Sequence, residues 1–131
     1  MAYSLHGGHN FHVPGASGQL DETTEDRAVV ARMYDLINDT VYIDTDEDGT
    51  TQGQNLANIC RNINSHGDVD LAVSVHFNAS NGDGHGVEVW AYDNGTDDVA
   101  SRICDQVAAL GYANRGVKYT HDLYVLRNTR P

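Results

Sequence analysis

Two kinds of hydrophobic pattern alternate along this chain. Short apolar runs such as 71–75 predict buried strands, whereas apolar residues three and four positions apart, such as Val29, Met33 and Leu36, predict helices. Gly, Asn and Asp stand at most of the breaks between them. The predicted elements are a strand at 2–5, a helix at 24–38, a strand at 40–44, a helix at 53–64, strands at 71–76 and 86–92, a helix at 97–109 and a short strand near 117–125.

This order of strands and helices predicts the fold class α/β. An alternating order favours an open, twisted and mostly parallel sheet with helices on both faces. Ligands of such sheets bind beyond the carboxyl ends of the strands. At 131 residues, we expect the chain to form one domain over 1–131.

Three residues near predicted element ends have side chains that suit a metal ion. His76 ends the apolar run 71–75, His9 follows the first strand in a glycine-rich turn, and Glu25 lies near the start of the helix at 24–38. A catalytic zinc takes three protein ligands and keeps its fourth position for water. Taken one at a time, each residue also has an ordinary explanation: a solvated histidine, or an acid favoured at a helix start.

Five motifs in a fixed order favour the metal-site interpretation over these ordinary roles. They are Gly8-His9-Asn10 with Pro14-Gly15-Ala16, then Glu25-Asp26, Val73-Ser74-Val75-His76-Phe77-Asn78-Ala79, Gly86-Val87-Glu88-Val89 and Asn114-Arg115-Gly116-Val117-Lys118. From about residue 3 to its last residue the chain resembles the zinc-dependent N-acetylmuramoyl-L-alanine amidases of phage endolysins and bacterial autolysins. Several motifs in the right order are more specific than any one of them.

The resemblance implies a cofactor, a ligand set and a reaction. It implies that His9, Glu25 and His76 bind Zn²⁺, and that the substrate is the amide between N-acetylmuramic acid and L-alanine in peptidoglycan. Glu22, one turn earlier, competes with Glu25 for the place of second ligand. We prefer Glu25, because the family's glutamate is followed by an aspartate and then by the apolar residues of the helix, as Glu25 is here.

The last residues depart from the family pattern. The segment 124–131 resembles the stretch before the family's next strand, which carries a second glutamate proposed as general base and leads into a final helix. Neither lies within these 131 residues, and Glu88 does not match that base, so no catalytic base is assigned. The sequence alone leaves three readings open: a chain end chosen within a longer protein, a truncated gene, or a second chain that completes the sheet. The alternative function is therefore a weak or inactive fragment that binds zinc or peptidoglycan, or half of a split enzyme.

Two residues are candidates for substrate binding. Asn78 stands two positions after His76 and can hydrogen-bond a partner of the metal site or the substrate. Arg115 can bind a carboxylate of the stem peptide through two parallel hydrogen bonds.

Charge and composition restrict the partners. The net charge is −11 and Lys118 is the single lysine, which argues against nucleic acid because phosphate binding depends on Lys and Arg. No apolar run is long enough to predict a membrane span, and no signal peptide is recognised. We therefore expect cytoplasmic synthesis with action at the bacterial wall, released as phage endolysins are. Cys60 and Cys104 are expected to be buried free thiols.

The acidic run at 44–49 offers a competing interpretation. Acids at alternate positions followed by glycine resemble the start of a calcium loop, with adhesion as a possible role. The twelfth position, however, is Asn55, which cannot supply the carboxylate that such loops need, and a strand rather than a helix is predicted before the run. A solvated loop is the simpler interpretation.

Overall fold

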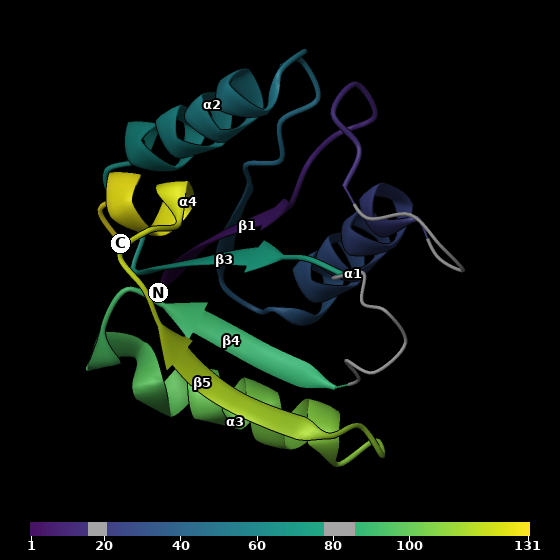
Figure 1. The fold of residues 1–131 in the computed structure, drawn as a ribbon. Coiled ribbons are helices and arrows are strands. Elements are labelled where there is room, and N and C mark those ends of the chain that lie inside the picture. The colour runs from purple at the N-terminus through teal and green to yellow at the C-terminus, as the bar shows by residue number, and fades with distance from the viewer. Residues whose placement is uncertain (16–20, 78–85) are drawn as a thin grey trace. The chain divides into compact units, whose positions relative to one another are not determined.

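The computed structural model describes residues 1–15, 21–77 and 86–131 (Figure 1). The chain divides into two compact units. The first unit comprises residues 1–79 with 129–131, and the second unit comprises residues 80–128. Each is described by itself.

The first unit is a parallel three-stranded sheet with two helices. Its elements are β1 (Ala2–Gly7), α1 (Glu22–Leu36), β2 (Thr40–Ile43), α2 (Gln52–Ser65) and β3 (Leu71–Val75). The strand order is β2-β1-β3, so the chain leaves the central strand first to one side and then crosses to the other. Because parallel crossovers are right-handed, the two helices must cover opposite faces. Figure 1 shows α1 and α2 on opposite sides of the sheet.

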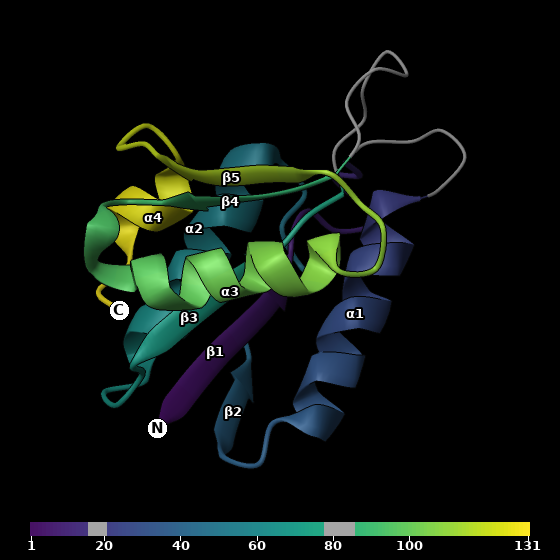
Figure 2. The same ribbon diagram turned by 90° about the horizontal axis from the view of Figure 1, so that it is seen from below.

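The second unit is a parallel strand pair with one long helix. Its elements are β4 (Val87–Ala91), the short 3₁₀ helix η1 (Asn94–Thr96), α3 (Asp97–Ala108), β5 (Asn114–Tyr119) and α4 (Tyr124–Asn128). The helix α3 packs on one face of the β4–β5 pair, as Figure 2 shows. The pairing is irregular between Val87 and Val89, and Gly116 on the facing strand has a positive φ of 84°.

These elements confirm the predicted α/β class with parallel strands. The last predicted strand, near 117–125, is wrong in its bounds, because β5 ends at Tyr119 and the apolar residues from Tyr124 onward form α4. A short apolar run is compatible with a strand or a buried helix turn, so its pattern alone cannot separate them.

Buried polar residues are unevenly placed. Those of the described chain all belong to the first unit: Ser4, His6, Asn10, Glu22, Thr23, Asp26, Asp44, Asp46 and Asn55. Since burying a polar group is costly unless it is bonded, this concentration marks the carboxyl ends of the strands as a specialised region.

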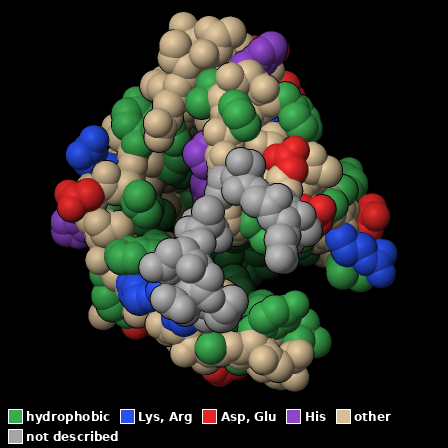
Figure 3. Space-filling view, turned by 45° about the vertical axis from the view of Figure 1, so that its right-hand side comes forward, with side chains coloured by type: hydrophobic (Ala, Val, Ile, Leu, Met, Phe, Trp, Pro, Cys, Tyr) green, Lys and Arg blue, Asp and Glu red, His purple; other side chains and the backbone are tan. Residues whose placement is uncertain are grey.

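The remaining burial is ordinary. Cys60 and Cys104 are buried free thiols, as expected. Large hydrophobic side chains also reach the surface, as the green areas of Figure 3 show. Among the described residues, no helix is both long enough and apolar enough to cross a membrane.

Candidate metal centre

The strands β1 and β3 bring two histidines to the same edge of the sheet. Gly7 pairs with Val75, and the N–H of Gly8 donates to the carbonyl of Val75 at 3.0 Å. His9 and His76 therefore follow the ends of adjacent parallel strands. Their rings meet edge to face, with centroids 5.4 Å apart.

Glu22, the first residue of α1, joins these histidines. The side chain of Asp21 caps the helix by accepting from the N–H of Thr23, and the Glu22 side chain is only 4% exposed. Its Oε1 lies 3.0 Å from Nδ1 of His76 and accepts from the N–H of Phe77 at 3.1 Å. Its Oε2 lies 3.8 Å from Nε2 of His9. One carboxylate thus contacts both histidines.

Two glycines make room for this arrangement. A Cβ at Gly8 would overlap the imidazole ring of His76, and a Cβ at Gly15 would overlap the side chains of Glu22 and His9. The glycines of the sequence motifs are therefore required by close packing around the cluster.

The cluster has the composition of a zinc site. His9, Glu22 and His76 each offer one ligand atom, and these atoms all lie within 4.8 Å of one another. Imidazole nitrogen and carboxylate oxygen are ligands that Zn²⁺ accepts, at about 2.0–2.2 Å each. The three residues fit a metal ion bound by three protein ligands.

Burial lowers the pKa of two histidines at or near the cluster, His76 and His6. Partial burial lowers the pKa of His76, and His9 lowers it further, although Glu22 acts in the opposite direction. Burial also lowers the pKa of His6, on β1, to about 4, with a contribution from His76. Neutral imidazole is the form that binds a metal, so this lowering of the pKa favours the metal-binding form of His76.

A comparison with known protein families identifies the family of this chain. The sequence profile of the family described as N-acetylmuramoyl-L-alanine amidase matches residues 5–131. The chain belongs to this amidase family. Two proteins of Clostridium perfringens, both described as uncharacterised, are 31% and 34% identical to it over 98% of its length. The chain spans 40% of the length of each of these relatives.

Solved amidase structures have the same fold. The catalytic domain of the CD27L endolysin, which targets Clostridium difficile, is 29% identical with a TM-score of 0.86, over 100% of this chain and 77% of the endolysin domain. The catalytic domain of CwlV, an amidase of Bacillus (Paenibacillus) polymyxa, is 19% identical with a TM-score of 0.73, over 98% of this chain and 74% of that one. At this lower identity, the second likeness shows the fold alone.

Within this amidase fold, the structure corrects the choice of glutamate. Glu22 lies beside the two histidines, and Glu25 is not part of the cluster. The helix begins at Glu22 with Asp21 as its cap, about two residues before the predicted start. One turn of helix separates the two acids, and the preference for Glu25 rested on the residues that follow it. Aspartate is a favoured helix cap, so Asp21 is the sequence signal that could have indicated the earlier start.

The other predicted site residues have different outcomes. Asn78 lies outside the described residues. Arg115 lies on β5, with its Nη2 3.8 Å from Oε2 of Glu88, and Lys118 also pairs with that carboxylate. The hydrogen bond from Lys118 holds the pKa of Glu88 below its usual value. Arg115 as a substrate contact stays a prediction.

The acidic loop is organised by hydrogen bonds. The buried carboxylate of Asp46 accepts from the side chains of Asn10, Asn55 and Asn58, and from backbone N–H groups within its own loop. Burial alone would raise the pKa of Asp46, but these donors outweigh burial and lower it. Asn55, at the position where a calcium loop needs a carboxylate, donates to Asp46 instead. This arrangement disfavours the calcium interpretation.

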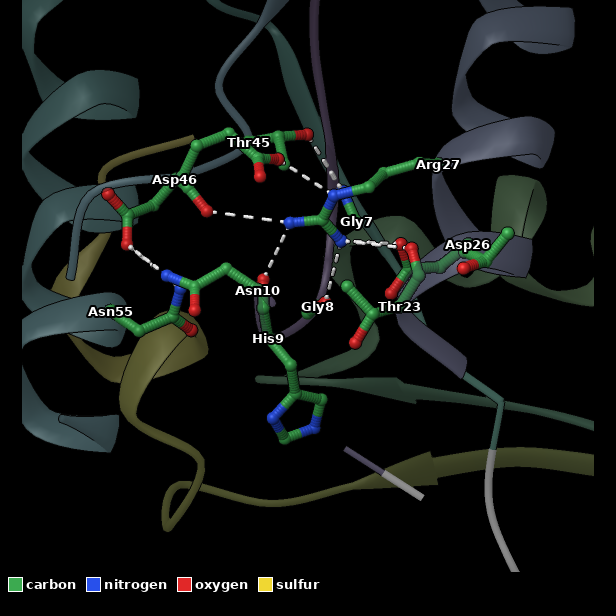
Figure 4. A network of polar contacts seen from close by, with 12 residues as sticks. Gly7, Gly8, His9, Asn10, Thr23, Asp26, Arg27, Thr45, Asp46 and Asn55 are labelled. Carbon is green, nitrogen blue, oxygen red and sulfur yellow. Dashed lines mark hydrogen bonds and ion pairs between the residues drawn. The ribbon is translucent and has the colours of Figure 1, made fainter. Parts of the chain in front are cut away.

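Sequence analysis missed a polar network around Arg27, next to the turn that carries His9. Figure 4 shows the guanidinium of Arg27 between Asp26, the backbone of Asp46 and the backbone at Gly8 and His9, with the His9 ring pointing away from it. An arginine inside a helical pattern resembles a surface residue, and only its 18% side-chain exposure in the fold reveals otherwise.

Proposed function

We propose that this chain uses zinc to hydrolyse the amide between N-acetylmuramic acid and L-alanine in peptidoglycan, and so acts at the bacterial cell wall. The observation that carries the proposal is the cluster of His9, Glu22 and His76 at the carboxyl ends of parallel strands, in a chain whose family is defined by this amidase activity. The family match spans both compact units, which supports residues 1–131 acting as one catalytic domain.

The three cluster residues have distinct tasks in this proposal. The rings of His9 and His76 supply nitrogen ligands, and Glu22 supplies a buried negative charge that offsets the charge of the cation. The N–H of Phe77 fixes the orientation of the Glu22 carboxylate. A zinc ion held there would polarise the amide carbonyl and activate water.

Two further residues are proposed to contact the substrate. Arg115 has the planar fork that binds a carboxylate of the stem peptide through two hydrogen bonds, and Asn78, two residues after His76, offers an amide to the substrate or to a metal ligand.

The two glutamates of α1 supply the test. We expect Glu22→Gln to weaken zinc binding by more than about 100-fold, because changes to partners of metal ligands already cost roughly 10- to 100-fold. Glu25→Gln is the matched control and should bind zinc as the unchanged protein does. Zinc content is measured after dialysis, and hydrolysis of a muramoyl-L-alanine peptide is measured in parallel.

Three outcomes of this test would contradict the proposal in different ways. Zinc binding that survives Glu22→Gln and is lost in Glu25→Gln would overturn the ligand set. Zinc binding without cleavage would favour the alternative of a zinc- or peptidoglycan-binding protein that needs further residues for catalysis. No zinc binding by the unchanged protein would refute the metal centre.

A further inference from the structure

His9 holds an unusual backbone conformation next to the metal cluster. Its φ is +58°, the only positive φ of a residue other than glycine in the described chain. The left-handed conformation is unfavourable for residues with a Cβ, and persists only where surrounding contacts enforce it. The contacts that enforce it here therefore also decide where the His9 ring points.

Arg27 supplies contacts to the two carbonyls of this turn. Its Nη1 donates to the carbonyl of Gly8 at 3.2 Å, and its Nη2 donates to the carbonyl of His9 at 2.9 Å. The two donors of one planar group thus hold two successive peptide carbonyls (Figure 4). On the other side of His9, the fully buried Asn10 fixes the turn through Gly49 and Asp46.

The guanidinium is itself immobilised. Its Nη1 donates to Asp26 at 2.8 Å and its Nε to Glu47 at 2.7 Å, and the ring of Phe11 lies 5.5 Å from its central carbon. Burial raises the pKa of Asp26 to about 6 even though Arg27 lowers it. A buried acid is thus placed beside the cation, and the guanidinium has little freedom to move.

The position of Arg27 on α1 links the turn to the third cluster residue. Arg27 follows Glu22 by five residues in the same helix. One rigid element therefore carries both the carboxylate of the cluster and the cation that fixes the His9 backbone. The distance between Glu22 and His9 is set through this helix.

We propose that Arg27 is a positioning residue of the metal centre, which binds the carbonyls of Gly8 and His9 and so directs the His9 ring toward Glu22 and His76. The zinc ion in this proposal rests on the proposed function. The backbone geometry that Arg27 enforces does not depend on it. Lysine cannot replace Arg27, because one ammonium group lacks the planar fork that reaches both carbonyls and Asp26.

The first test measures zinc affinity by competition with a coloured chelator, on variants that remain folded. We expect Arg27→Lys to weaken binding about 10- to 100-fold, as changes to supporting partners of metal ligands do. Arg32→Lys is the control, since Arg32 is an exposed arginine of the same helix. In a His9→Ala background Arg27→Lys should cost nothing further, whereas in a His76→Ala background its cost should persist. An equal loss in all backgrounds, or none in the unchanged protein, would overturn the proposal.

The second test needs no metal. The backbone carbon chemical shifts of Gly8 and His9 report φ, and in the metal-free protein they should change in Arg27→Lys but not in Arg32→Lys. Unchanged shifts would refute the positioning role even if zinc never binds, and changed shifts would support it even if the proposed function fails. If Arg27→Lys does not fold, Glu47→Gln loosens the guanidinium from an exposed position, and it must move the same signals to a smaller extent for the proposal to survive.

Discussion

At the scale of residues, the cluster depends on the missing side chain of Gly8 as well as on the imidazole ring of His76. The imidazole of His76 occupies the space that a Cβ on Gly8 would fill. The carboxylate of Glu22 then meets that ring at 3.0 Å. A single methyl group at position 8 is therefore in direct conflict with a proposed metal ligand.

This conflict gives a prediction with an internal control. Gly8→Ala should displace the His76 ring, lower the zinc affinity at least about 10-fold and reduce the free energy of unfolding by about 1–3 kcal/mol, as overpacking does. Gly53→Ala, in α2, meets nothing within 4 Å, and should leave zinc binding unchanged while adding about 0.5 kcal/mol of stability. Zinc competition and urea unfolding measure both quantities. Unaltered zinc affinity in Gly8→Ala would contradict the packing argument.

At the scale of elements, polar residues form most of the buried face of α1. The apolar positions that predicted this helix do not define its buried face, since Val29 is 37% exposed and Leu36 is 66% exposed. The face turned inward carries Thr23, Asp26 and Val30, all buried. A helix oriented in this way places Glu22 at the strand ends, with Arg27 on the same element.

The start of α1 can be tested against the start of α2. Asp21 and Thr51 both cap a helix through a side-chain oxygen. Asp21→Ala and Thr51→Ala should each cost about 1 kcal/mol in the free energy of unfolding. Only Asp21→Ala should also weaken zinc binding, because Glu22 is the next residue. Equal effects of the two variants on zinc affinity would show that the metal centre does not depend on the fixed start of α1.

At the scale of the whole molecule, negative charge dominates. The net charge is −11, and red acidic side chains are visible over the face in Figure 3. Like charges at this density repel one another and oppose compaction. The anionic character also opposes nonspecific attraction to wall polymers that are themselves anionic.

Salt should therefore stabilise the protein. Raising the sodium chloride concentration from about 0.01 M to about 0.15 M shortens the Debye length from about 30 Å to about 8 Å and screens the repulsion. We expect the midpoint of thermal unfolding, measured by calorimetry on the metal-free protein, to rise by several degrees. A midpoint that falls over this range would show that attractive ion pairs such as Arg27 with Asp26 outweigh the repulsion.

The sequence by itself determined the α/β class and the order of the elements as far as β5, and it identified His9 and His76 as candidate ligands. Strand and helix periods are local properties, so they can be read from neighbouring residues. The motifs around His9 and His76 follow strand ends, and strand ends of a parallel sheet meet at one edge. These features need no knowledge of packing.

Only the tertiary structure showed that Glu22, and not Glu25, lies beside the two histidines, and only it revealed the contacts of Arg27. The choice of glutamate depends on where α1 begins and which face it turns to β1, and a shift of one turn moves a carboxylate away from the cluster. Arg27 matters through contacts with the carbonyls of Gly8 and His9, which lie 19 and 18 residues away in the chain. Such contacts arise from packing between distant segments, and no local pattern encodes them.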